Sequence, residues 1–441
     1  MQVKNPDAAG IDISSREHFV AVPADRDKTP VRKFDSFTED LYQLVGWLKQ
    51  CRIKTVAMES TGVYWYHLFT ILQEEGFEVY LVNAWHIKNV PGRKSDVSDC
   101  QWIQQLHSHG LLSNSFQPDE LTRELRNYTR QRKTIVQDMT TAINRMQKSM
   151  ELMNIKLNNV IRDITGKSGM KIIEAILSGE RDAEKLASLA DYRIKASRKK
   201  IIKSLQAHYR QDQLFNLRQS YDHYQFLLNQ LKQCDQMAEQ TIDRFNKTGD
   251  QHKILPKDRP QKNQPDFDVR KHLYRIHGID IMQVHGLKRT SALTILSETG
   301  PDLKDKFPTE KQFCSWLNVV PDNKISGGRV ISSTVKKKRN KAGQAFRDAA
   351  NTLWSAKGPL GDYLRNKRSK KGSKQAVVAT ARKLASIYYK MVTEKVEFSL
   401  DIIMEQNKKL IQGRYNQLVK KLERTKVQLS GVQEFSTAVS W

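Results

Sequence analysis

The chain has 441 residues and a formal net charge of +26, which leaves room for two or three domains and favours a polyphosphate partner. It begins without a basic-then-apolar signal segment and has no apolar run near the ~20 residues that span a bilayer, so we expect a soluble, cytoplasmic protein without a membrane partner. Its scattered cysteines, Cys51, Cys100, Cys234 and Cys314, indicate neither a zinc site nor a disulfide framework.

Short apolar segments alternate with helical ones over the first 110 residues. Three strands at hairpin distance, followed by alternating helices and strands, favour a ribonuclease-H-like α/β fold. The expected strands lie at 8–13, 18–23, 31–37, 55–59 and 77–82, and the expected helices at 39–50, 63–75 and 96–109.

Four carboxylates stand near the ends of these elements. Asp12 and Glu59 close two apolar strands, and strand ends are where ligands gather in open α/β sheets. Asp96 and Asp99 are three residues apart in a helical pattern, so they share one helix face. A single acid at a strand end is usually a cap or a surface charge, whereas four in this order indicate a metal site. We expect them to bind Mg²⁺ or Mn²⁺.

The middle of the chain changes character. After Pro118, the stretches 118–158 and 204–245 contain no further Pro and no Gly and space apolar residues at helical intervals, which predicts two long helices folded back as an antiparallel hairpin. Such a hairpin is typically a packing or dimerisation element. Residues 159–203 are mixed in character and end in a basic run, and their role stays open. Residues 246–268 are polar and rich in proline, which is typical of a linker.

A possible phosphate-binding turn follows the linker. Gly286 separates two short helical stretches, as in a helix-hairpin-helix, where the following helix N-terminus and its neighbours Lys288 and Arg289 can hold a phosphate. An ordinary turn is the other interpretation of the same residues.

A serine followed by two glycines lies further along, at Ser326, Gly327 and Gly328. By itself such a sequence is usually a turn, although two glycines also let a phosphodiester approach the hydroxyl closely. The densest basic tract of the chain comes next, and we expect it to contact phosphates. The residues assigned to this surface are Arg329, Lys336, Lys337, Lys338, Arg339, Lys341 and Arg347.

Five segments of the chain resemble the DEDD transposases of the IS-one-ten (IS110) insertion-sequence family. The resemblance implies a RuvC-like metal domain, a coiled-coil insertion, and a second domain in which Ser326 is the nucleophile. It assigns the metal to the four carboxylates named above. Some members are guided by a structured bridge RNA, and Piv-type DNA invertases are close relatives. The matching segments are GIDIS (10–14), MESTGVYW (58–65), VYLVNAWHIKNVPGRKSDVSDC (79–100), VHGLKRTSALTILSETG (284–300) and VVPDNKISGGR (319–329).

The expected fold class is therefore an α/β ribonuclease-H-like (RuvC-like) N-terminal domain, a long α-helical coiled-coil insertion, and a mainly α-helical C-terminal transposase domain. The chain departs from the family pattern at Asn318, where Gly is common, at Cys100, where Ala is usual, and in the tail beyond Glu394. The expected segments are a metal domain at 1–117, the coiled-coil insertion at 118–246, a linker at 247–268, the serine-bearing domain at 269–395, and a helical extension at 396–441.

These features predict an enzyme, a Mg²⁺-dependent transposase that cleaves and exchanges DNA strands through a covalent phosphoserine intermediate. We expect donor and target DNA as partners and a homo-oligomer, dimer or tetramer, formed through the coiled coil. Because no zinc finger or recognition helix is evident in the sequence, a structured noncoding guide RNA is expected to choose the sites. The alternatives are a Piv-like site-specific invertase without a guide and a non-catalytic nucleic-acid-binding protein.

Overall fold

The structure is a computed structural model, and it divides into two compact units, residues 1–117 and 118–441, each described here by itself. No helix in the described part of the chain is long and apolar enough to cross a membrane. The structure describes residues 3–83, 96–249, 253–256, 260–335, 340–399, 412–413, 415–416 and 418–426, with the backbone alone at 96–98.

Unit 1 is built on a mixed five-stranded sheet with the strand order β3-β2-β1-β4-β5. The first three strands pair antiparallel as a meander, while β4 lies parallel to β1, and β5 parallel to β4. The expectation of an α/β N-terminal domain is thus confirmed. The strands are β1 (Ala8–Ile13), β2 (Glu17–Ala21), β3 (Val31–Asp35), β4 (Thr55–Glu59) and β5 (Glu78–Val82).

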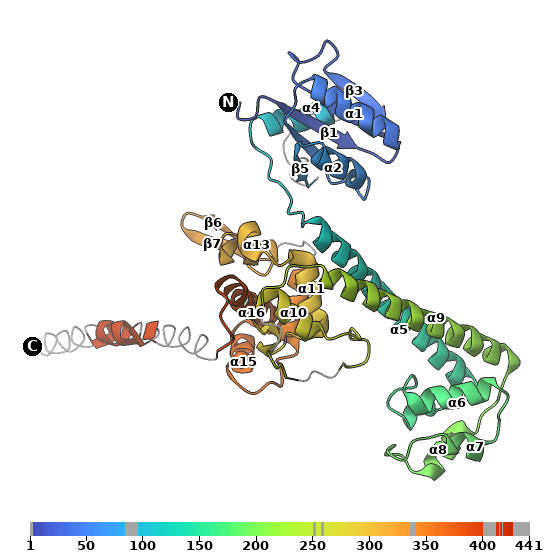
Figure 1. Cartoon of the computed structure of the whole chain (residues 1–441). Coiled ribbons are helices and arrows are strands. Elements are labelled where there is room, and N and C mark those ends of the chain that lie inside the picture. The colour runs from blue at the N-terminus through green and yellow to red at the C-terminus, as the bar shows by residue number, and fades with distance from the viewer. Residues whose placement is uncertain are drawn as a thin grey trace, which may run out of the picture. The chain divides into compact units, whose positions relative to one another are not determined.

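Helices cover both faces of this sheet (Figure 1). The helices α1 (Thr38–Gln50) and α2 (Trp65–Glu74) bury Leu44, Leu68 and Leu72 in one core with alternate residues of the strands. The helix α4 (Asp96–Ser108) packs on the opposite face, where Ile103 contacts Ala57 and Val82.

The approach of α4 to β1 depends on Gly10. A Cβ atom added at this position would lie 2.2 Å from the backbone nitrogen of Gln104 and 2.4 Å from the carbonyl oxygen of Cys100. Since real Cβ atoms do not approach backbone so closely, only glycine lets the helix backbone rest directly on the strand. This glycine therefore sets the position of α4 over the ends of β1 and β4.

Unit 2 begins with two helices of 33 residues each, α5 (Glu120–Leu152) and α9 (Gln211–Asp243), which lie side by side (Figure 1). They are antiparallel, because Glu124 near the start of α5 accepts hydrogen bonds from Thr241 and Arg244 at the end of α9. Neither helix contains Gly or Pro, so no residue of low helix propensity interrupts it. The expected helical hairpin is therefore present.

Three short helices form a compact cap at the far end of this hairpin, in the segment 159–203 whose character was mixed in sequence (Figure 1). Their isoleucines and leucines join the apolar core of α5 and α9, so the segment extends that core. The helices are α6 (Lys167–Leu177), α7 (Ala183–Ser188) and α8 (Arg198–Leu205).

The rest of unit 2 is mostly helical, as expected, and surrounds an aromatic core. Phe313, Phe346 and Tyr388 are fully buried and their rings lie within 6.3 Å of one another, centroid to centroid. The elements are α10 (Val269–His277), α11 (Arg289–Thr299), α12 (Leu303–Lys306), α13 (Glu310–Trp316), β6 (Asp322–Ser326), β7 (Arg329–Thr334), α14 (Lys341–Asn351), α15 (Pro359–Lys371) and α16 (Ser373–Glu394).

The end of the expected linker is packed, unlike the solvated segment that its composition predicts. Phe267 is buried, and its carbonyl oxygen accepts a hydrogen bond of 2.8 Å from the Arg289 guanidinium. The carbonyl oxygen of Asn263 accepts one of 3.0 Å from Arg132. Because arginines from two helices satisfy its backbone, a polar segment can lie against the helical core.

Candidate functional site

Asp12 and Glu59 lie at neighbouring strand ends in unit 1. The parallel pairing of β1 and β4 aligns Ile11 with Met58, so Asp12 and Glu59 are the next residues along their strands. Ile11 and Met58 point into the core beneath α1 and α2. Since side chains alternate between the faces of a strand, both carboxylates belong to the opposite face, which α4 covers.

The first turns of α4 carry the other two acids. The close approach at Gly10 places the turn around Cys100 against β1, and Asp99 is half-buried beside it. The pKa of the buried Cys100 thiol is raised to about 12, chiefly by burial and in part by the negative charges of Asp12 and Asp99. Both carboxylates therefore lie within electrostatic reach of one sulfur atom. The side chain of Asp96 lies outside the described residues.

The donor set fits a hard divalent cation. All four candidates offer carboxylate oxygens, the ligands that Mg²⁺ and Mn²⁺ prefer, and three of them are placed by two strand ends and the helix that covers them. Glu59 also accepts a hydrogen bond of 3.1 Å from Thr61. Among the side chains that the structure describes, no group of three acids, histidines or cysteines converges closely enough to hold an ion.

Ser326 lies at the end of strand β6, next to a hairpin turn, which agrees with the turn that the Ser-Gly-Gly sequence indicates by itself. Strands β6 and β7 pair antiparallel, and Ser326 faces Arg329 across the turn. Gly327 and Gly328 have φ angles of 55° and 74°, so both adopt the left-handed conformation that a two-residue type I′ turn requires. The glycines are thus explained by the hairpin itself.

The hairpin is exposed on both faces. Every residue of β6 is exposed, and the side chains of Val330 and Ile331 on β7 are 55% and 71% exposed. A serine hydroxyl needs a base or a metal to become a nucleophile near neutral pH. With Ser326 at the tip of so open a hairpin, a substrate has free access to the hydroxyl.

Two residues expected to contact phosphate also support the fold. Arg289 is only 3% exposed, and its guanidinium ties the carbonyl oxygens of Pro265 and Phe267 to α11. Gly286 packs against α14, where an added Cβ would lie 2.7 Å from the carbonyl oxygen of Ala349. Arg289 is therefore buried by its contacts with the backbone, whereas Gly286 is half-buried on the wall of a cavity, and its contact with phosphate stays a prediction.

The Arg347 side chain is bonded to the backbone of Asn318. The Arg347 guanidinium donates a hydrogen bond of 2.5 Å to the Asn318 carbonyl oxygen, and burial lowers the pKa of this arginine. Asn318 follows the C-cap residue of α13 with a φ of 58°. This left-handed position favours glycine and tolerates asparagine, so the departure from the family pattern costs the fold little.

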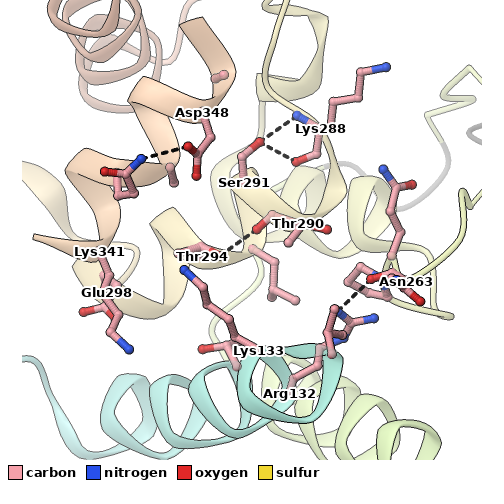
Figure 2. Close-up of a pocket in the computed structure, with 18 of the residues that line it drawn as sticks. Arg132, Lys133, Asn263, Lys288, Thr290, Ser291, Thr294, Glu298, Lys341 and Asp348 are labelled. Atoms are coloured by element: carbon pink, nitrogen blue, oxygen red, sulfur yellow. Dashed lines mark hydrogen bonds between the residues drawn. The ribbon is translucent and has the colours of Figure 1, made fainter. Parts of the chain in front are cut away.

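Lys288 and Lys341 lie on a cavity of about 550 Å³ between α5, α11, α14 and residues 261–265. Figure 2 shows Lys341 near Lys133 and Glu298 on one side of this space, and the side chain of Lys288 extending away from them. The sequence did not indicate Lys133, because it lies in a helix whose spacing predicted only packing. The remaining basic candidates, Lys336, Lys337, Lys338 and Arg339, lie outside the described residues.

Two known family models match separate parts of the chain. A model of IS110 DEDD transposases matches residues 9–155, and a model described as transposase, IS116/IS110/IS902 family, matches residues 280–365. The first match contains Asp12, Glu59, Asp99 and Lys133, and the second contains Ser326, Lys288 and Lys341. No curated protein matches the chain. Together the two matches cover slightly more than half of the sequence, and the chain belongs to the IS110 family of DNA transposases.

Proposed function

We propose that the protein is a divalent-metal-dependent recombinase of an insertion sequence, in which Ser326 forms a covalent phosphoserine–DNA intermediate. The observation that carries the proposal is the placement of Asp12 and Glu59 at adjacent strand ends on the face covered by α4, which also bears Asp99. An α/β sheet with acids at these positions is what a ribonuclease-H-like, RuvC-like metal domain needs.

The chain's own residues divide the chemistry between the two units. Asp12, Glu59, Asp96 and Asp99 would hold the cation, and Ser326 would supply the nucleophile. A bound Mg²⁺ or Mn²⁺ neutralises charge on phosphate oxygens and lowers the pKa of a hydroxyl near it. The Oγ–P bond forms as one P–O bond to deoxyribose breaks, and the proton leaving Oγ balances the one taken up by the released oxygen. One phosphoester replaces another, so strand exchange needs no external energy.

The remaining parts of the chain have supporting roles in this proposal. The hairpin of α5 and α9 would act as a coiled coil that joins copies into a dimer or tetramer, which hold donor and target DNA together. The net charge of +26 would bind nucleic-acid backbones and leave site choice to a structured guide RNA. Residues 118–246, 247–268, 269–395 and 396–441 would then be the insertion, linker, serine domain and extension.

Trapping of the covalent adduct tests the proposal. With DNA nicked near the exchange point, Ser326→Ala should bind DNA as the wild type does but form no adduct, whereas Ser332→Ala and Ser333→Ala in the same hairpin should form it. Asp12→Asn should also abolish adduct formation, and Mg²⁺ should no longer raise its melting temperature. An adduct of undiminished yield in Ser326→Ala would move the nucleophile elsewhere.

A further inference from the structure

We infer that the cavity between α5, α11 and α14 is an anion site that holds one backbone phosphate of the nucleic-acid partner. This inference rests on the proposed function for the identity of the partner, but the anion site itself follows from the residues that line the cavity. Lys133 comes from α5, Lys288 precedes α11 and Lys341 begins α14, so three separate segments contribute lysines to the wall of one cavity. In Figure 2 Lys133 and Lys341 lie near each other beside Glu298, whereas the side chain of Lys288 extends away from them.

More positively charged than negatively charged side chains line the cavity. Glu298 is committed to Arg130, whose guanidinium binds it through two hydrogen bonds of 2.9 Å, and it also pairs with Arg126 at 3.2 Å. Asp348 keeps its negative charge, because its hydrogen bond of 2.8 Å comes from the neutral Gln344 amide, but the lysines that line the cavity outnumber it. Within the described part of the chain, Lys133 and Lys341 form no ion pair.

The lysines also repel one another. Burial lowers the pKa of Lys341, and the positive charges of Arg130 and Lys133 lower it further, against the opposing effect of Glu298. Folding therefore places like charges near one another at the exposed edge of the cavity, which costs free energy unless an anion joins them. A phosphate between Lys133 and Lys341 would relieve this repulsion.

The remaining walls suit a nucleic-acid strand rather than a small ion alone. Thr290 and Ser291 lie in the first turn of α11, whose N-terminal end attracts negative charge. Val136 and Leu293 add apolar surface next to the lysines. The volume of about 550 Å³ exceeds what a single phosphate fills, so it leaves room for the attached sugar.

Inorganic phosphate is the first probe, titrated at constant ionic strength into the full-length protein freed of nucleic acid. The double variant Lys133→Gln/Lys341→Gln should bind phosphate about tenfold more weakly than the wild type, because both charge-assisted contacts are lost. In the absence of phosphate, the melting temperature of the double variant should be no lower than that of the wild type, because the repulsion between the two lysines has been removed. The matched control is Lys148→Gln/Lys304→Gln, which removes two exposed lysines from α5 and α12 and should bind like the wild type.

Lysine acetylation separates the possible sources of the phosphate. The two probes are a DNA duplex from the end of the element and a structured RNA from its flank. The probe that supplies the phosphate should slow acetylation of Lys133 and Lys341 but not of Lys148. The slope of log affinity against log salt should fall by about 0.9 for duplex DNA in the double variant. Lys133→Arg/Lys341→Arg should restore binding.

Three results would overturn the inference. Phosphate binding of equal strength in the double variant places the anion elsewhere. A lower melting temperature of the phosphate-free double variant shows that the lysines only support the fold. Protection by phosphate but by neither nucleic acid shows an adventitious ion only. None of these measurements depends on strand exchange, so a failure of the serine mechanism would leave them interpretable.

Discussion

At the scale of single residues, contacts with the backbone account for several glycines and arginines that resemble phosphate-binding residues in sequence. Gly10, Gly286 and Asn318 each occupy a position that a larger or unsuited side chain would disturb. Arg289 and Arg347 donate hydrogen bonds to backbone carbonyl oxygens. Such residues look like functional candidates in sequence, because glycine and arginine are also the residues of phosphate sites.

Gly10→Ala should destabilise unit 1 by about 2–4 kcal/mol, because its methyl group would overlap the backbone of α4. Hydrogen exchange of the β1 amides in the full-length protein measures this loss. The control is Gly46→Ala in α1, where an added Cβ meets nothing within 4 Å. That change should stabilise unit 1 by about 0.5–1 kcal/mol through helix propensity. Equal effects of the two substitutions would contradict the packing of α4 on Gly10.

His107 predicts a pH dependence for unit 1. Burial lowers its pKa to about 4, next to the Thr55 hydroxyl at 2.8 Å and the ring of Tyr80. The unfolded chain takes up the proton near pH 6.5 and the folded chain only near pH 4, so stability is full above 6.5 and falls as pH drops towards 4. The loss is about 3 kcal/mol.

Denaturant titrations between pH 7 and pH 4 check this expectation. His107→Gln should flatten the pH dependence, although not fully, because burial also lowers the pKa of His18 in the same unit. The exposed His67 provides the control, and His67→Gln should leave the pH profile unchanged. An unchanged profile in His107→Gln would mean that the imidazole is protonated in the folded protein.

At the scale of elements, a buried ion pair holds the helical hairpin and the neighbouring segment together. Arg132 of α5 and Asp235 of α9 lie 2.6 Å apart, with side chains 5% and 7% exposed. Arg132 also donates to the Asn263 carbonyl oxygen, and the Asp266 amide donates to Asp235. Two helices and the end of the linker thus share one pair of charges.

Asp235→Ala should lower the free energy of unfolding by about 3–5 kcal/mol, because it leaves the Arg132 guanidinium buried without its partner. Replacing both residues, in Arg132→Met/Asp235→Leu, should cost clearly less than the sum of the single changes. Denaturant titration of the full-length variants measures the difference. Additive losses would show that the two side chains do not interact.

At the scale of the whole molecule, the proposed function includes a guide RNA, which the charge of +26 would help to bind. Protein treated with nuclease and freed of RNA should lose recombination at its native sites, and a transcript of the element's flank should restore it. Rewriting the loops of that transcript should redirect the enzyme, while a scrambled transcript should not rescue it. Full activity without RNA would favour the invertase alternative.

Local sequence patterns were sufficient for the strands and helices of unit 1 and for the two long helices, but not for α6, α7 and α8 or for the β6–β7 hairpin. The alternation of apolar residues placed β1 and β4, the long runs without Gly or Pro placed α5 and α9, and both depend only on neighbours along the chain. The positions of Asp12 and Glu59 at strand ends follow from the same patterns. Their role as metal ligands and that of Ser326 as nucleophile stay predictions.

Local sequence patterns did not predict the contacts between segments that are distant along the chain. The sequence did not show that Arg289 would be buried against Phe267, or that Lys133 would meet Lys341 across a cavity, because these pairs are remote along the chain. A basic residue has the same local pattern whether it faces solvent, a carbonyl oxygen or a phosphate. Only packing chooses among these partners, since burial makes an unpaired charge costly and forces each one to be matched.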